Sequence, residues 1–406
     1  MADNDSRPRL SYVDWARGIA VLLMIEAHTS DAWTRLSPAV RRTIAFRDAT
    51  VLGGFAAPLF LWLAGLAAVL AATRAAERMG SRRAAVEMIC RRGLEIFILG
   101  FLFRVQGFII TPGSHPVTLF RVDILNIMGP AIAIAGIVWG LAGRPAARVF
   151  WYACIAAAFA MATPIVRASP TIDAWPLWLQ WYMRPFGEFT IFTLFPWAGF
   201  VFAGGAVGVL IAEARQPGAE RRLQAVLGIV GAALVVLGFY AAGRPSIYAA
   251  SSFWTSSPTW FAIRLGILMI ALTVIYASEA AIAALKPRAA PGLPGPPKGA
   301  ATGLPGPPKS AATGLPGPPK RAQREGGDPL AKMGRSSLFI YWIHVELVYG
   351  YASWLWRHRL PLWGTAIAFS LFCVLMYRAI GWRDTLVGKW RNRSRNTHHA
   401  QQPATA

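Results

Sequence analysis

Four polar residues lie on one face of the first apolar segment, 12–30. Arg17 and His28 are eleven residues apart, close to three helical turns at about 100° per residue, so their side chains project from one side about 16 Å apart. Asp14 precedes Arg17 by three residues, Asp31 follows His28 by three, and both join this face. A line of polar side chains on an otherwise apolar helix predicts that this face borders protein or a water-filled cavity rather than lipid.

The residue types suggest a different task for each end of this face. An arginine suits a phosphate or carbonyl ligand, and Asp14 is placed to hold Arg17. A histidine can act as a general base, and Asp31 or Asp123 is placed to orient His28. We therefore interpret Arg17 as a donor-binding residue and His28 as a general base. The structural alternative is an Asp14–Arg17 pair at the membrane edge and a histidine at a helix end.

A second polar cluster is predicted in the apolar segment 336–356. Ser337 and Tyr341 precede His344 by seven and three residues, so the three side chains share one helix face. We expect Tyr341 and His344 to contact an acyl thioester or to assist proton transfer. The alternative is a buried histidine that is hydrogen-bonded to the helix backbone or to the tyrosine.

Asp123 begins the segment 122–142 at the membrane level predicted for His28. It could orient that base or bind a hydroxyl or amine of an acceptor. It could equally cap the helix N-terminus, where a carboxylate is favoured by the helix dipole.

These residues must be positioned by membrane helices. Hydrophobic residues make up 55% of the 406 residues and charged residues 15%, against about 25% charged in soluble proteins. Ten apolar segments exceed the roughly 18 residues that cross a bilayer. They are 12–30, 50–72, 93–111, 122–142, 147–166, 189–212, 223–242, 259–281, 336–356 and 361–380. The predicted fold class is all-α: a polytopic membrane helical bundle of about ten transmembrane helices, with irregular external loops at 31–49 and 166–188.

The distribution of charge sets the expected orientation. The net charge is +22, and 28 of the 41 Lys and Arg residues fall in loops and tails on one side if the N-terminus is inside. This is the positive-inside pattern of membrane proteins. We therefore expect an N-in, C-in, multi-pass protein of the bacterial inner (cell) membrane, and no nucleic-acid partner.

The chain divides by composition. Residues 1–286 form the predicted membrane core, and 329–380 hold its last two helices. Between them, 287–328 repeats GLPGPPK three times, which predicts a disordered cytoplasmic linker because it has few large apolar side chains to bury. Residues 381–406 form a basic cytoplasmic tail.

The sequence carries no motif for disulfide or metal chemistry. The three cysteines stand at unrelated positions, so we expect neither a disulfide framework nor a metal site. The alternative function is a transporter or an ion or proton carrier that uses the Arg17/His28 stripe. Such proteins often show paired internal repeats, and none is visible here.

Several segments carry a resemblance to a known family. Residues 14–24, Asp-x-x-Arg-Gly-Ile-Ala-x-Leu-Leu-Met, resemble the opening helix of the heparan-alpha-glucosaminide N-acetyltransferase-like family. The Arg17-x10-His28 spacing is similar to a motif of the related acyltransferase-3 membrane family. Residues 57–65, 123–129 and 334–346 resemble further segments of the family. Eukaryotic members place Asn at the position of His28 and a His in the following loop, whereas 31–49 has no His here.

The resemblance implies an acyltransferase that uses acetyl-CoA (acyl-CoA) as donor and no metal. It implies N- or O-acetyl transfer to a saccharide or other envelope acceptor on the far side of the bilayer, and it leaves a homo-oligomer open. The candidate catalytic residues are His28, Asp31 and Asp123, and the candidates for binding acyl-CoA are Arg17, Asp14, His344 and Tyr341.

Overall fold

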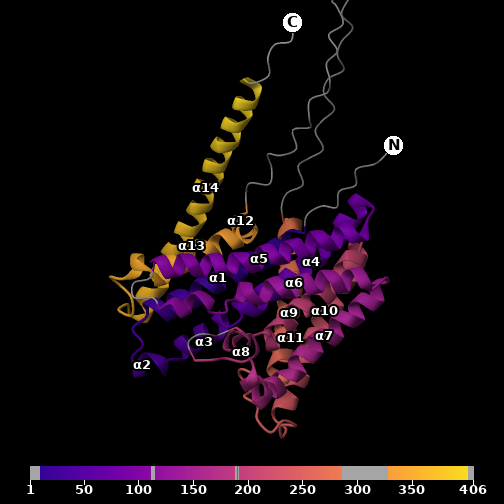
Figure 1. The fold of residues 1–406 in the computed structure, drawn as a ribbon, viewed down its shortest axis with the longest axis horizontal. Helices are drawn as coiled ribbons and strands as arrows, with labels where there is room; N and C mark the ends of the chain where they lie inside the picture. Colours follow the sequence, from indigo (N-terminus) through magenta and orange to yellow (C-terminus); the bar gives the residue numbers. More distant parts are fainter. Residues whose placement is uncertain (1–9, 111–114, 188–189, 191, 286–327, 401–406) are drawn as a thin grey trace, which may run out of the picture.

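The computed structural model describes residues 10–110, 115–187, 190, 192–285 and 328–400, and this part of the chain is built from helices (Figure 1). The α-helices are α1 (Ser11–Trp33), α2 (Pro38–Arg41), α3 (Ile44–Gly53), α4 (Ala56–Met79), α5 (Arg82–Ile110), α6 (Ile124–Leu141), α7 (Pro145–Ala168), α8 (Leu177–Met183), α9 (Leu194–Glu213), α10 (Pro217–Ala242), α11 (Pro258–Leu285), α12 (Pro329–Arg335), α13 (Ser337–Tyr349) and α14 (Leu362–Ala400). Three 3₁₀ turns lie in the connections between helices: η1 (Pro116–Phe120), η2 (Pro170–Ala174) and η3 (Tyr351–Ser353).

The helical membrane class is confirmed, with a smaller number of spans. Among the described residues, eight stretches are long and apolar enough to cross a membrane. They are α3 with α4, α5, α6, α7, α9, α10, α11 and most of α14. Of the other two predicted spans, α1 is about 34 Å long but carries four charged side chains. α13 has only 13 residues, because the helix ends before Gly350 and continues as the turn η3.

The predicted external loops are partly helical. In 31–49, the Thr43 hydroxyl accepts a hydrogen bond from the backbone N–H of Phe46 at 3.3 Å and caps α3, which then runs into α4. In 166–188, the turn η2 and the helix α8 fold back so that Trp181 is buried. Capping and packing therefore order segments that carry no membrane-length apolar run.

Close helix packing holds the bundle together, most extensively between α5 and α6, α4 and α9, α10 and α11, and α7 and α9. Between α4 and α9 the backbones touch. A Cβ at Gly65 would lie 1.8 Å from the carbonyl oxygen of Val201, and one at Gly204 would lie 1.8 Å from that of Trp62. Small residues at such crossings are typical of membrane helices, where close approach supplies the association energy.

The apolar core is divided into two clusters that meet at α1. One gathers around α4, α6 and α9, and the other joins α1 with α13 and α14. α1 also packs closely against α12, which follows Asp328; the carboxylate of this residue caps α12 by accepting from the backbone N–H of Leu330 at 2.9 Å. Apart from Asp328, the predicted linker 287–328 lies outside the described residues.

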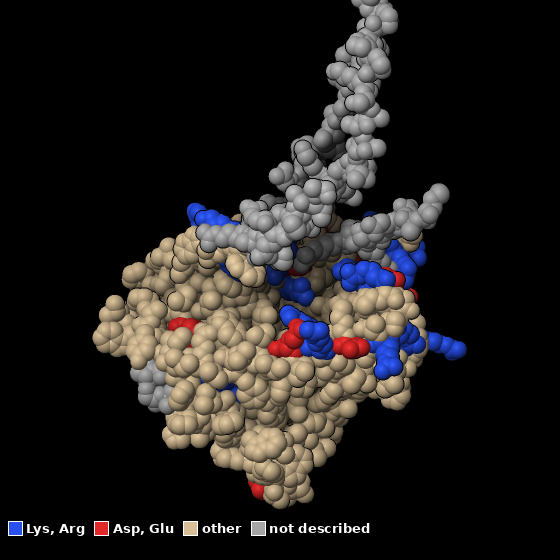
Figure 2. Space-filling model, turned by 45° about the horizontal axis from the view of Figure 1, so that its top comes forward, with Lys and Arg blue, Asp and Glu red and all other residues tan. Residues whose placement is uncertain are grey.

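Charged side chains gather on one side of the molecule. In Figure 2, most of the blue and red surfaces lie in the upper half of the view, while the body below is mostly uncharged. α14 continues as a helix to Ala400, through most of the predicted basic tail, and projects from the bundle (Figure 1). An uncharged body with charge at one face fits a bilayer around the bundle.

Candidate active site

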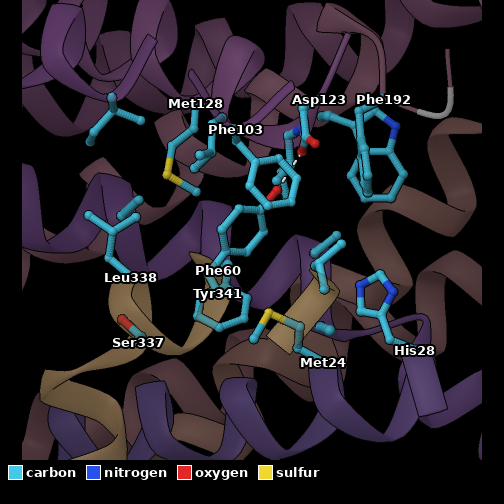
Figure 3. Close-up of a pocket in the computed structure, with 18 of the residues that line it drawn as sticks. Met24, His28, Phe60, Phe103, Asp123, Met128, Phe192, Ser337, Leu338 and Tyr341 are labelled. Carbon is cyan, nitrogen blue, oxygen red and sulfur yellow. Dashed lines mark hydrogen bonds between the residues drawn. The ribbon is translucent and has the colours of Figure 1, made fainter. Parts of the chain in front are cut away.

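A cavity of about 1080 Å³ lies inside the bundle alongside α1. α1 lines it from Arg17 to Asp31, fourteen residues or about 21 Å along the helix. The other walls come mainly from α4, α5, α6 and α13. Figure 3 shows Ser337 toward one end of the view and His28 and Phe192 toward the other. The cavity thus follows α1 over about two thirds of the ~30 Å hydrocarbon core of a bilayer.

His28 is linked to Asp31 through a tyrosine. Nδ1 of His28 lies 3.0 Å from the hydroxyl oxygen of Tyr349, and that hydroxyl donates to Oδ2 of Asp31 at 2.8 Å. Because the tyrosine proton goes to the carboxylate, its oxygen accepts from Nδ1–H of His28. This hydrogen-bond pattern assigns the tautomer and leaves the lone pair on Nε2. Nε2 is then the nitrogen available to remove a proton from a substrate.

His344 packs beside His28. Its side chain is fully buried, and the two imidazole centroids are 5.2 Å apart. Nδ1 of His344 lies 2.9 Å from the carbonyl oxygens of both Ile340 and Tyr341, which is the backbone-bonded arrangement of a buried histidine. Its Nε2 has no hydrogen-bond partner among the described residues. His344 therefore supports the ring of His28 and stands behind the residues that line the cavity.

Asp123 joins three helices at the cavity wall. Its Oδ1 accepts from the backbone N–H of Ile124 at 2.5 Å and from the hydroxyl of Tyr341 at 2.6 Å, and its Oδ2 is paired with Arg104. With Asn126 it forms a capping box at the start of α6. The carboxylate lines the cavity, but its described hydrogen bonds go to these groups rather than to His28.

Two guanidinium groups meet one buried carboxylate at the other end of the cavity. Nη1 of Arg17 lies 3.7 Å from Oδ1 of Asp14, and Nη1 of Arg335 lies 4.0 Å from Oδ2 of the same residue. The Asp14 side chain is 4% exposed, whereas those of Arg17 and Arg335 are 28% and 31% exposed and line the cavity. The carboxylate holds the two arginines, and their outer N–H groups suit a phosphate.

The structure gathers all seven predicted site residues around this one cavity. Arg17, His28, Asp31, Asp123 and Tyr341 line it, while Asp14 and His344 stand directly behind lining residues. Sequence reasoning missed Arg335, at the end of α12, and Tyr349, at the end of α13. Arg335 belongs to the segment 334–346 that was singled out, but Tyr349 had no signal beyond its place at the end of an apolar run.

The fold and the cavity define a class: a multi-pass helical membrane protein with a polar site inside the bundle. The chain belongs to the family described as heparan-alpha-glucosaminide N-acetyltransferase, catalytic, whose model matches residues 9–245. The resemblance seen in the sequence is thereby confirmed, and it indicates a membrane acetyltransferase. The comparison with curated proteins finds no match.

The matched region ends just after α10. It includes α1 with Arg17 and His28, and α6 with its cap Asp123. The helices α11–α14 follow it, and they carry Tyr349 and Arg335. The candidate site is therefore completed by helices beyond the matched region.

Proposed function

We propose that this protein transfers an acetyl group from acetyl-CoA, bound at the Arg17 end of the cavity, to a saccharide or other envelope acceptor bound at the His28 end. In the N-in orientation the donor enters from the cytoplasm and the acceptor from the opposite side. The observation that carries the proposal is the single cavity that reaches both residues.

The donor's shape supports this assignment. The phosphates of acetyl-CoA are anions that Arg17 and Arg335 would bind, and a long flexible arm separates them from the thioester. The base on α1 stands about 16 Å from Arg17, eleven helical residues away. A donor with its charges at one end and its reactive group at the other suits a site with this separation.

The chemistry follows from the tautomer of His28. Nε2 accepts the proton of the acceptor amine or hydroxyl as that nitrogen or oxygen attacks the thioester carbonyl carbon. The new C–N or C–O bond forms, the C–S bond breaks, and the CoA thiolate leaves and takes up a proton. Tyr349 and Asp31 hold the ring in the required orientation and stabilise the imidazolium that forms transiently.

The test is acetyl transfer across a membrane. Protein is reconstituted into vesicles that enclose amino and hydroxyl sugars, and labelled acetyl-CoA is added outside. We expect labelled sugar inside, and a loss of about 10²- to 10⁴-fold in turnover for His28→Ala. His115→Ala is the matched control, because His115 is exposed, caps the start of η1 and does not line the cavity.

Two results would contradict the proposal. One is turnover by His28→Ala equal to that of the wild type. The other is uptake of a sugar or an ion with no acetyl transfer to any acceptor, which would favour the carrier function.

A further inference from the structure

The last helix, α14, is longer than a bilayer is thick. Its 39 residues extend about 58 Å, against about 30 Å for the hydrocarbon core of a bilayer and about 45 Å with both headgroup layers. Trp363 at its start and Trp382, nineteen residues or about 28 Å further on, are both mostly exposed. Because tryptophans concentrate at the two boundaries of the hydrocarbon core, this spacing places the transmembrane part of α14 between them. The helix therefore continues past the core after Trp382, and it projects from the bundle in Figure 1.

Exposed apolar side chains continue beyond this boundary. Leu386 and Trp390 follow Trp382 at intervals of four residues, so the three side chains lie along one side of the helix. They are 62%, 67% and 71% exposed in chain order. The core cluster that joins α14 to α1 and α13 ends at Ile380 on this helix, and none of the described side chains between 381 and 390 is buried. Large apolar side chains that project beyond both the hydrocarbon core and the bundle mark a contact surface.

The same side of the helix carries positive charge. Arg378 precedes Trp382 by four residues and Lys389 follows Leu386 by three, so both cations neighbour the apolar side chains on the helix surface. Both are exposed, and among the described residues neither forms a salt bridge. From residue 385 onward the sequence contains no Asp or Glu, and it adds three further arginines, Arg391, Arg393 and Arg395.

Contacts with the bundle fix the rotation of α14 at this level. Nη2 of Arg383 donates to the hydroxyl oxygen of Ser336 at 3.1 Å, and its guanidinium carbon lies 4.9 Å from the ring centroid of Phe339. Nζ of Lys332 on α12 lies 5.2 Å from the ring centroid of Tyr377. Because these contacts hold one side of α14 against α12 and α13, the exposed side chains that follow cannot turn into the bundle.

We propose that the segment 378–390 of α14 is a docking surface for anionic phospholipids of the leaflet on the α12 side. Leu386 and Trp390 would lie among the headgroups and upper acyl chains, and Arg378 and Lys389 would pair with lipid phosphates. Charge argues against two other occupants. A second copy of α14 would bring like charges together, and the chain's own segment 287–328 is also net positive.

The test follows a fluorophore on this surface. Leu386→Cys is introduced into a cysteine-free background, labelled with bimane and reconstituted into vesicles of phosphatidylcholine alone or with about 30 mol% phosphatidylglycerol. A phosphatidylcholine that carries a nitroxide near its headgroup quenches a label that lies at the membrane surface. We expect at least about twofold more quenching with phosphatidylglycerol, and a loss of this difference in about 1 M salt, where the Debye length falls to about 3 Å.

Gly388→Cys is the matched position for the label. It lies two residues from Leu386, on nearly the opposite side of the helix, and a Cβ there meets nothing within 4 Å. Its label should be quenched less than the label at 386 in both kinds of vesicle.

The charge is tested with the label kept at 386. Arg378→Gln combined with Lys389→Gln should remove most of the phosphatidylglycerol effect. Arg221→Gln combined with Arg222→Gln is the matched control, because it removes the same charge at two exposed positions near the start of α10 and should leave the effect unchanged. The melting temperature of each variant is measured alongside. If the charge variants do not fold, the comparison of positions 386 and 388 still decides.

Equal quenching at 386 in the two kinds of vesicle would overturn the inference. So would equal quenching at 386 and 388, or a phosphatidylglycerol effect that survives the loss of both cations. A bimane signal that changes with the density of protein in the membrane, and not with lipid charge, would assign the surface to a second copy instead. The measurement requires no acetyl-CoA, so its outcome is independent of the proposed function.

Discussion

The proposed role of His28 as a general base depends on which ring nitrogen carries the proton. The hydroxyl of Tyr349 decides this, because it donates to Asp31 and so accepts from Nδ1 of His28. The ring is further confined by His344, whose imidazole lies 5.2 Å away and is anchored to its own helix backbone. A base that is oriented in this way does not have to reorganise when it takes a proton.

Removal of the hydroxyl at position 349 should therefore slow the chemical step. For Tyr349→Phe we expect kcat to fall about 10- to 100-fold, by analogy with the loss of hydrogen-bond partners that orient the histidine ligands of metal sites. The KM for acetyl-CoA should stay within about twofold of the wild type, because the donor's arginines stand at the other end of the cavity. Steady-state kinetics with the donor varied gives both values.

Tyr351→Phe serves as the matched control, since this tyrosine lies two residues further on and is 61% exposed. An unchanged kcat in Tyr349→Phe, or an equal fall in both variants, would show that the hydroxyl of Tyr349 does not position the base.

At the scale of the elements, the short helix α12 packs against α1 at the end of the cavity that we propose binds the donor. It lies against α1 so closely that a Cβ at Gly334 would be 2.0 Å from the carbonyl oxygen of Asp14, and one at Gly18 would be 2.3 Å from that of Leu330. This contact places Arg335 beside Asp14. Two glycines thus permit the approach on which the pair of arginines depends.

Gly334→Ala should separate the two helices. Backbone atoms cannot yield to the added methyl group, so we expect a loss of about 1–3 kcal/mol in stability, as in other overpacked cores. We also expect the KM for acetyl-CoA to rise as Arg335 moves away from Asp14. Thermal unfolding in detergent and donor kinetics measure the two effects.

Gly381→Ala is the corresponding control, because a Cβ at Gly381 meets nothing within 4 Å. If Gly334→Ala has the melting temperature and the donor KM of the control, the close contact is unimportant for the site.

At the scale of the whole molecule, α1 runs through the apolar bundle and carries Arg17 near one end and His28 near the other. The N-terminal end of α1 packs on α12, and charged side chains concentrate on that side of the molecule (Figure 2). α10 joins two turns on opposite sides of the bundle, one before Pro217 and one after Ala242. The positive-inside distribution of the sequence predicts that the side with α12 faces the cytoplasm.

This orientation can be tested at the two ends of α10. Single cysteines are introduced in a cysteine-free background as Gly218→Cys and Ser246→Cys, both at exposed positions. A membrane-impermeant thiol reagent should label position 246 in intact cells and position 218 only in inverted vesicles. The reverse pattern would exclude the N-in, C-in orientation and the proposed direction of transfer.

The sequence predicted the positions of most helices, but it predicted their ends and the connecting segments less well. Hydropathy is a local property, so the apolar segments were located, but α1 and α13 fall outside the eight spanning stretches. α1 is too polar, and α13 is interrupted at Gly350. The predicted irregular loop 31–49 contains most of α3, because a threonine cap starts that helix.

In the candidate site, too, local sequence patterns located some residues, and contacts between distant helices supplied the others. Helical periodicity alone placed Arg17 and His28 on one face, and both line the cavity. Tyr349 and Arg335 enter the site from positions more than 200 residues away from α1, and no local pattern signals such a contact. The predicted direct role of Asp31 is mediated by Tyr349, since the hydroxyl stands between carboxylate and ring.

By itself, then, the sequence determined an all-helical membrane protein with a polar stripe on its first helix. Composition and periodicity are sufficient for this, because the bilayer demands apolar length and internally satisfied backbones. Only the tertiary structure decided which groups the stripe meets. The tautomer of His28 and the paired arginines at Asp14 both depend on the packing of helices distant in the chain.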